Sequence, residues 1–223
     1  MNLRKRLKGV RVTVQLAEQI NRAPMAEKLG MLDALDHYRA EFKRGERTQR
    51  PSPGGLAAGA HDAMQTWIDD AVANPPAGRV ASCQRGCAHC CRLLVSVFPD
   101  EATLAMIAAD DVGLQVDRER LHRQAEARTT DEWGALSRDD RTCVFLRDEQ
   151  CAIYEHRPSA CRKYMVASPP ELCDTDRHPG QEVAVLACNA AEVITSAAIT
   201  TWGWEPLAAA LLRVIDADKN RAS

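Results

Sequence analysis

Apolar side chains recur at helical spacing in long stretches of the chain. Between residues 25 and 42 they fall three or four positions apart, and Pro24 stands where a helix can start. The same spacing returns between residues 56 and 73, where the run Asn74-Pro75-Pro76 ends it. Residues three or four apart share one face of a helix, so both stretches predict amphipathic helices.

Shorter helices are predicted along the rest of the chain. They cover residues 99–109, 118–128, 184–200 and 205–215, and acidic Asp100 and Glu101 lie in the first turn of the first of these. Residues 3–17 also favour a helix, although Val10, Val12 and Val14 alternate as in a strand. We find no internal repeat and no alternation of strands with helices, which predicts a mainly α fold.

A segment rich in Gly, Pro and polar residues, 45–55, predicts a linker or surface loop. It divides the chain into an N-terminal helical appendage, residues 1–55, and a small helical domain, residues 56–223, with C-terminal helices and a loop-rich cysteine cluster. The appendage has 12 Lys and Arg against 6 Asp and Glu, so its charge is +6 and the remainder carries −8.

The basic excess of the appendage lies at its start, in Arg4, Lys5, Arg6, Lys8 and Arg11. Such a cluster can contact nucleic acid or an anionic lipid surface. No aromatic residue that could stack on bases is interleaved with it, so a solvated helix face is favoured over nucleic-acid binding. We expect the N-terminal helices to offer a surface for a protein partner, and the sequence gives no indication of the oligomeric state.

The N-terminus has the basic start of a signal peptide without its apolar core, because Arg11, Gln15 and Glu18 interrupt the apolar positions. No run approaches the roughly 18 apolar residues of a membrane span. We therefore expect a cytoplasmic protein, in which cysteines stay reduced.

Four cysteines lie within nine residues of the segment SCQRGCAHCCR, residues 82–92, and five more follow downstream. The first four are Cys83, Cys87, Cys90 and Cys91; the others are Cys143, Cys151, Cys161, Cys173 and Cys188. Nine cysteines are about 4% of the chain, below the density of a small disulfide scaffold, and an odd number cannot all pair. A metal site is therefore favoured over a disulfide knot.

Thiolates favour zinc, Cu(I) or iron-sulfur clusters over hard cations. The spacing Cys87-x2-Cys90 can direct two sulfurs at one metal, whereas adjacent Cys90 and Cys91 are awkward for chelating a single ion. Seven or more candidate ligands also exceed the four cysteines of one zinc ion or one [4Fe-4S] cluster. The sequence therefore predicts a polynuclear site, or a complete site with spare thiols.

Positive side chains accompany these cysteines. Arg85, Arg92, Arg157 and Arg162 can offset the negative charge of a thiolate site and hydrogen-bond to its sulfurs, although any of them can instead be a surface arginine. His89 is a candidate ligand or a neighbour of the ligands.

Two enzymatic alternatives are weaker. The spacing Cys83-x3-Cys87-x2-Cys90 is also the motif of radical SAM enzymes, but only 132 residues follow Cys91, without the strand and helix alternation that such a barrel needs. A single thiol nucleophile is also conceivable. The clustering of so many cysteines argues against it.

The complete pattern is C-x3-C-x2-C-C at residues 83–91, then C-x7-C-x-I-Y-E-x-R-P-x2-C-R at residues 143–162. It closely resembles the YkgJ-type cysteine-cluster family of bacterial zinc- or iron-chelating domains, often called Fe-S oxidoreductases. The resemblance covers about residues 82–173. It implies metal binding by the seven cysteines of the pattern and, because family members commonly have later cysteines, extends to Cys173 and Cys188.

From these patterns we expect an iron-sulfur cluster, or polynuclear iron, used for electron transfer or redox sensing. A zinc-chelating structural or interaction module is the alternative. A similar cysteine segment occurs in flagellin lysine methylases, so a metal-dependent protein-modifying enzyme is a second alternative.

Overall fold

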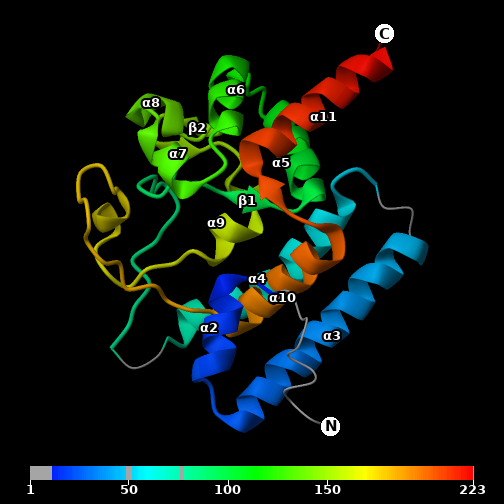
Figure 1. Ribbon diagram of the computed structural model, residues 1–223, viewed down its shortest axis with the longest axis vertical. Helices are drawn as coiled ribbons and strands as arrows, with labels where there is room; N and C mark the ends of the chain where they lie inside the picture. The colour runs from blue at the N-terminus through cyan, green and yellow to red at the C-terminus, as the bar shows by residue number, and fades with distance from the viewer. Residues whose placement is uncertain (1–11, 49–51, 76–77, 223) are drawn as a thin grey trace.

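The chain is mainly helical in the computed structural model, which describes residues 12–48, 52–75 and 78–222 (Figure 1). The α-helices are α2 (Val14–Arg22), α3 (Met25–Thr48), α4 (Gly55–Ala73), α5 (Pro99–Asp111), α6 (Arg118–Glu126), α7 (Thr130–Ala135), α8 (Arg138–Arg141), α9 (Ser159–Lys163), α10 (Asn189–Trp202) and α11 (Leu207–Ala222). Two 3-10 turns, η1 (Tyr154–His156) and η2 (Pro170–Cys173), and four short strands complete the described elements: β1 (Ser96–Val97), β2 (Leu146–Arg147), β3 (Gln150–Cys151) and β4 (Glu205–Pro206). The predicted fold class is confirmed.

Helix α10 is enclosed by the rest of the fold, because every residue from 191 to 198 is buried. It packs against α2, α3 and α4 (Figure 1). Leu32 and Leu35 of α3 meet Val193 and Ala197 of α10 in one apolar cluster. A helix that is buried on all sides needs neighbours all round, which explains why several helices pack against it.

A second apolar cluster joins α11 to α5 and α6, and includes Ala105, Leu121, Phe145 and Leu211. An antiparallel pair of two-residue strands, β1 and β4, places Val97 opposite Glu205. The start of α11 therefore lies beside the chain that leaves the first cysteine group.

Several predicted boundaries differ from the structure. Helix α3 continues through Gly45 to Thr48, so the connection to α4 is shorter than predicted. An ion pair between Arg44 and Glu41 lies in this part of the helix. The space around Gly45 is open, since a Cβ added there would have no other atom within 4 Å. The described part of the first helix begins at Val14, where the Thr13 hydroxyl accepts a hydrogen bond from Leu16 N–H. The basic cluster at residues 4–11 lies outside the described residues.

The division of the chain at residue 55 stays a prediction, although α2 and α3 pack against α10 of the second predicted unit. Within the described ranges, no helix combines the length and the apolar character that crossing a membrane would need.

Replacing Leu211 with Ala should lower the free energy of unfolding by about 2–5 kcal/mol, because the side chain is fully buried and its loss leaves a cavity. Urea denaturation measures this change. The matched control is Leu29→Ala on α3, where the side chain is 38% exposed and the expected cost is about 0.5 kcal/mol or less. Equal losses in the two variants would contradict the assigned core.

Candidate metal centre

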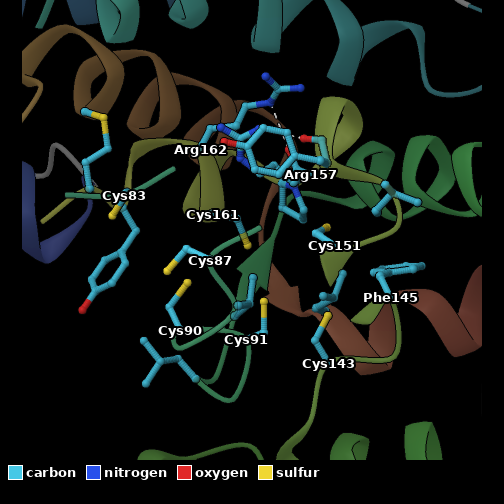
Figure 2. Close-up of a pocket in the computed structure, with 18 of the residues that line it drawn as sticks. Cys83, Cys87, Cys90, Cys91, Cys143, Phe145, Cys151, Arg157, Cys161 and Arg162 are labelled. Atoms are coloured by element: carbon cyan, nitrogen blue, oxygen red, sulfur yellow. Dashed lines mark hydrogen bonds between the residues drawn. The ribbon is translucent and has the colours of Figure 1, made fainter. Parts of the chain in front are cut away.

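Seven cysteines line one cavity of about 410 Å³, although they come from three separate parts of the chain (Figure 2). They are Cys83, Cys87, Cys90, Cys91, Cys143, Cys151 and Cys161. Each is partly exposed, and all nine cysteines of the chain are free thiols. The structure thus gathers the two predicted cysteine groups around a common space.

Consecutive tight turns shape the first group. The N–H of Cys87 donates to the carbonyl of Gln84 at 3.0 Å, and the N–H of Cys91 donates to the carbonyl of Ala88 at 3.0 Å. Gly86 lies within the first of these turns at φ 92°, in a region that residues with a Cβ rarely adopt. The glycine therefore lets the chain turn sharply between Cys83 and Cys87.

Backbone hydrogen bonds join the two groups directly. The N–H of Cys143 donates to the carbonyl of Cys91 at 2.8 Å. On the other side of the loop, Ser82 N–H donates to the carbonyl of Val166 at 2.8 Å, and Val166 N–H donates to the sulfur of Cys83 at 3.3 Å. These bonds fix the first cysteine loop between the segments that contain the later cysteines.

A small hairpin carries the next two cysteines. Strands β2 and β3 pair antiparallel with Leu146 opposite Cys151, and Cys143 lies just before β2. The turn residues Asp148 and Glu149 have φ values of 50° and 56°, as a two-residue hairpin with a type I′ turn requires. This hairpin folds Cys151 back toward Cys143.

Helix α9 carries Cys161. Pro158 precedes the helix, and its carbonyl accepts hydrogen bonds from the N–H groups of Cys161 and Arg162, both at 2.9 Å. Cys161 therefore lies in the first turn of a five-residue helix.

The seven thiols face a shared space rather than one point. Within residues 12–48, 52–75 and 78–222, no three His, Cys, Asp or Glu side chains stand close enough together to hold a single metal ion. The cavity volume is in the range of small-ligand pockets, roughly 300–1,000 Å³. The cavity therefore has room for a group of several atoms.

Burial holds several of these thiols in the protonated form. It is the main cause of the raised pKa of Cys83, Cys151 and Cys161, and it raises the pKa of Cys143 to about 12. For Cys90, a hydrogen bond with the Cys91 side chain is the largest cause of the raised pKa, followed by burial. A metal that binds here must displace these protons.

Arg157 is a positive group that acts on several of these thiols. It lines the cavity, and its charge lowers the pKa of Cys83, Cys90 and Cys151 against the larger effects that raise it. Its guanidinium carbon lies 3.8 Å from the centre of the Tyr154 ring, and Nη1 donates to the Tyr154 carbonyl at 2.7 Å. Arg157 is thus held in place beside the sulfurs.

Two other predicted arginines have different surroundings. Arg162 lines the cavity, but its donors reach Gln65 at 2.7 Å, the Arg157 carbonyl at 3.0 Å and the Glu155 carbonyl. Arg85 is exposed, pairs with Glu155 at 2.6 Å and does not line the cavity, although its charge contributes to the pKa of Cys151.

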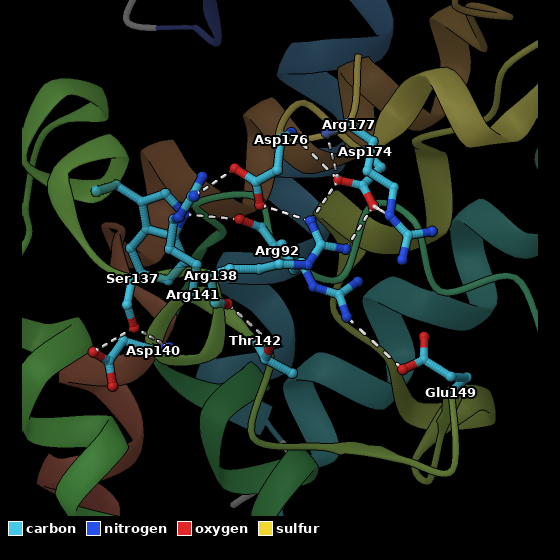
Figure 3. Close-up of polar contacts among 11 residues, drawn as sticks. Arg92, Ser137, Arg138, Asp140, Arg141, Thr142, Glu149, Asp174, Asp176 and Arg177 are labelled. Carbon is cyan, nitrogen blue, oxygen red and sulfur yellow. Dashed lines mark hydrogen bonds and ion pairs between the residues drawn. The ribbon is translucent and has the colours of Figure 1, made fainter. Parts of the chain in front are cut away.

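Arg92 lies outside the cavity wall, near a separate polar network (Figure 3). Its Nη2 lies 3.8 Å from Glu149, and its carbonyl accepts a hydrogen bond from the Trp133 indole at 2.8 Å. Although Arg92 directly follows Cys91 in the chain, its guanidinium group pairs with Glu149 in the turn between β2 and β3.

The centre of this network is Asp174, which is 2% exposed and accepts both Nη groups of Arg138, at 2.8 and 2.6 Å. Arg138 also pairs with Asp176 at 2.8 Å, and Asp176 pairs with Arg141 at 2.5 Å. Helix α8 is thereby fixed to the loop that follows Cys173. Because α8 leads into Cys143, the network braces one wall of the cavity.

The remaining cysteines do not line the cavity. Cys173 is buried beside it, where Tyr164, itself part of the cavity wall, hydrogen-bonds to its sulfur; burial is the main cause of its pKa of about 11. Cys188 is buried in an apolar cluster and donates to the Trp67 carbonyl at 3.5 Å. His89 does not line the cavity either. Metal binding by these three residues stays a prediction.

Arg141 and Tyr164 are two of the cavity residues that were not anticipated from the sequence. Arg141 lies two positions before Cys143, which is the same kind of proximity that identified Arg85. Tyr164 follows Cys161 by three positions, but a tyrosine near a cysteine has no specific meaning in a sequence. Only the first of the two could have been found by spacing.

Residues 82–189 match the family model CxxCxxCC, described as "Putative zinc- or iron-chelating domain". The matched segment is just under half of the chain, and we refer to it as the CxxCxxCC domain. The match confirms the resemblance seen in the sequence, although here three residues rather than two separate the first two cysteines. Comparison with curated proteins and comparison with solved structures each found no match. The CxxCxxCC domain contains all seven cavity cysteines, whereas α4 and α11 lie outside the matched residues.

Replacing Asp174 with Asn should lower the melting temperature at neutral pH, because it breaks the two-point contact with Arg138. Hydrogen bonds from Arg138 hold the pKa of Asp174 well below its usual value, so its contribution to stability is complete above roughly pH 4 and is lost as the pH falls through the lowered pKa. Thermal unfolding between pH 2 and pH 7 should show the gap between wild type and variant narrowing at acid pH. The exposed Asp111, changed to Asn, is the control; an equal loss there would contradict a role for the network.

Proposed function

We propose that the CxxCxxCC domain binds an iron-sulfur cluster, or polynuclear iron, through the seven cavity cysteines. The observation that supports this most strongly is the convergence of seven thiols from three separate segments on one cavity. Thiolates are ligands of soft metals and of iron-sulfur clusters, and the family description names zinc or iron.

Three features favour a polynuclear group over a single ion. One tetrahedral ion takes four thiolates, which would leave three of the cavity cysteines unused. Adjacent Cys90 and Cys91 suit two metals or two edges of a cluster better than one ion. The cavity volume of about 410 Å³ is also large for a closed structural zinc site.

Arg157 suits a redox role. An iron-sulfur cluster supplies one-electron chemistry, and its reduction potential depends on net charge, hydrogen bonds to the sulfurs and exposure to solvent. In the CxxCxxCC domain, Arg157 supplies positive charge to three thiols, and partial exposure of the seven cysteines leaves the group within reach of a redox partner. Electron transfer or redox sensing is therefore the use we infer.

Zinc chelation is the second candidate, because the family description includes zinc and the same thiolates bind it. In that case the metal organises the loops around the cavity, and the N-terminal helices serve as a surface for a protein partner. Val14, Met25 and Leu29 are exposed apolar residues on α2 and α3 that such a partner could cover. A protein-modifying enzyme is less favoured, since Leu93, Phe145, Ile153 and other apolar side chains form much of the cavity wall.

We infer a cytoplasmic location, because a site built from free thiols requires a reducing environment. All nine cysteines are unpaired, which supports this assignment.

Anaerobic purification followed by iron and acid-labile sulfide analysis tests the metal. We expect both elements in stoichiometric amounts, together with visible colour. Cys87→Ala should lose most of the metal and much of the soluble protein, because metal binding at such a site is coupled to folding. Colourless protein with stoichiometric zinc would reject the iron version, and full metal content in Cys87→Ala would reject that cysteine as a ligand.

Replacing Arg157 with Gln should weaken metal binding roughly 10-fold, since residues that surround metal ligands typically contribute 10–100-fold to affinity. Loss of positive charge should also lower the reduction potential, because the reduced cluster carries more negative charge. Competition with a chelator and redox titration measure the two effects. The control is Arg85→Gln, which removes an exposed arginine stacked at 5.2 Å on the same Tyr154 ring and should change both quantities less. Equal effects in the two variants would contradict the assignment.

A further inference from the structure

A buried carboxylate joins three segments next to Cys161. Glu101 of α5 is 2% exposed, and its Oε1 accepts a hydrogen bond from the N–H of Ser159 at 2.5 Å and lies 2.9 Å from Nε2 of His61 in α4. Its Oε2 accepts from the N–H of Phe98 at 3.2 Å. Ser159 is the first residue of α9, so the carboxylate reaches the helix that contains Cys161.

Helix α4 makes a second contact on the other side of Cys161. The amide oxygen of Gln65 accepts a hydrogen bond from Nη1 of Arg162 at 2.7 Å. His61 and Gln65 are four residues apart and therefore lie on one face of α4. This face of α4 is linked to the chain on both sides of Cys161. His61 contacts Glu101, which accepts the hydrogen bond from Ser159, two residues before Cys161. Gln65 accepts the hydrogen bond from Arg162, one residue after Cys161.

These contacts matter because α9 cannot fix its own position. It has five residues, and isolated helices shorter than about 12–15 residues are marginal in water. Its place is set by what it packs against and hydrogen-bonds to. A buried carboxylate is costly unless it is well hydrogen-bonded, and Glu101 meets this condition with three partners.

We propose that Glu101, held by His61, is a positioning residue that sets the place of Cys161 in the cavity wall, and that Gln65 supports the same segment through Arg162. The inference rests on the proposed function, because it takes Cys161 as a metal ligand. His61 and Gln65 precede the CxxCxxCC domain, residues 82–189, so α4 supplies part of the metal centre from outside the matched segment.

Cobalt(II) binding to the reduced, metal-free full-length protein tests this inference, because thiolate-to-cobalt charge-transfer absorption reports the number of bound thiolates. Cys161→Ala is the reference for a site with that thiolate missing. Glu101→Ala should bind Co²⁺ roughly 10- to 100-fold more weakly than wild type, with an absorption per bound cobalt that falls to the level of Cys161→Ala. Glu101→Gln keeps an oxygen acceptor for Ser159 N–H and should stay closer to wild type.

Leu35→Ala separates positioning from general loss of stability. Leu35 is fully buried in the cluster formed by α2, α3 and α10, and none of the cavity cysteines belongs to that cluster. The variant should melt at lower temperature but keep the wild-type cobalt spectrum. Gln65→Ala removes a partly exposed side chain and should weaken Co²⁺ binding less than Glu101→Ala, without a large change in melting temperature. If Glu101→Ala does not fold, Gln65→Ala tests the inference in its place.

The outcomes distinguish this inference from the proposed function. If Cys161→Ala loses absorption while Glu101→Ala and Gln65→Ala match wild type, only the positioning role is overturned. If Leu35→Ala loses as much absorption as Glu101→Ala at equal loss of stability, the role is also overturned. If wild type shows no thiolate absorption, or Cys161→Ala equals wild type, the proposed ligand set fails and the inference fails with it.

Discussion

Thiolates repel one another, and a site that gathers seven cysteines must hold them together against that repulsion once a metal has removed their protons. In this protein the backbone meets the requirement first. The hydrogen bond from Cys143 to the Cys91 carbonyl joins two cysteine groups that are about fifty residues apart in the chain, and Val166 fixes the loop on its other side. Arg157 then supplies charge where the sulfurs meet.

The charge on the cysteines therefore differs between the metal-free and the metal-loaded protein, while the surrounding fold is the same. Burial favours neutral thiols, as the raised pKa of Cys143 illustrates, so the buried cysteines carry little negative charge in the free protein. Binding exchanges those protons for a metal and leaves thiolates that the arginines can stabilise. The Arg138, Asp174 and Arg141 network, in which every charge has an opposite partner, keeps the surrounding wall in place during this exchange.

The sequence predicted the long helices and the meeting of the cysteine groups, because both depend on strong signals: apolar periodicity and ligand chemistry. It did not predict the hairpin between Cys143 and Cys151, since the Asp148-Glu149 turn adopts positive φ without the Asn or Gly that usually marks it. Nor could spacing show which arginines face the cavity. Arg92 adjoins a cysteine yet turns to Glu149, whereas Arg157 is four residues from Cys161 and lies beside the thiols. Such orientations depend on tertiary contacts.

The pairing of β1 with β4 has a consequence for how the domain can be isolated. It brings the start of α11 to the cavity, where Leu207 and Ala208 form part of the wall, while Gln65 and Ile68 of α4 form another part. A fragment cut at residues 82 and 189 would keep every cysteine of the cavity and lose two sides of its enclosure. Water and oxygen would then reach the thiols. The smallest useful fragment must therefore include the residues that enclose the cavity as well as the cysteines.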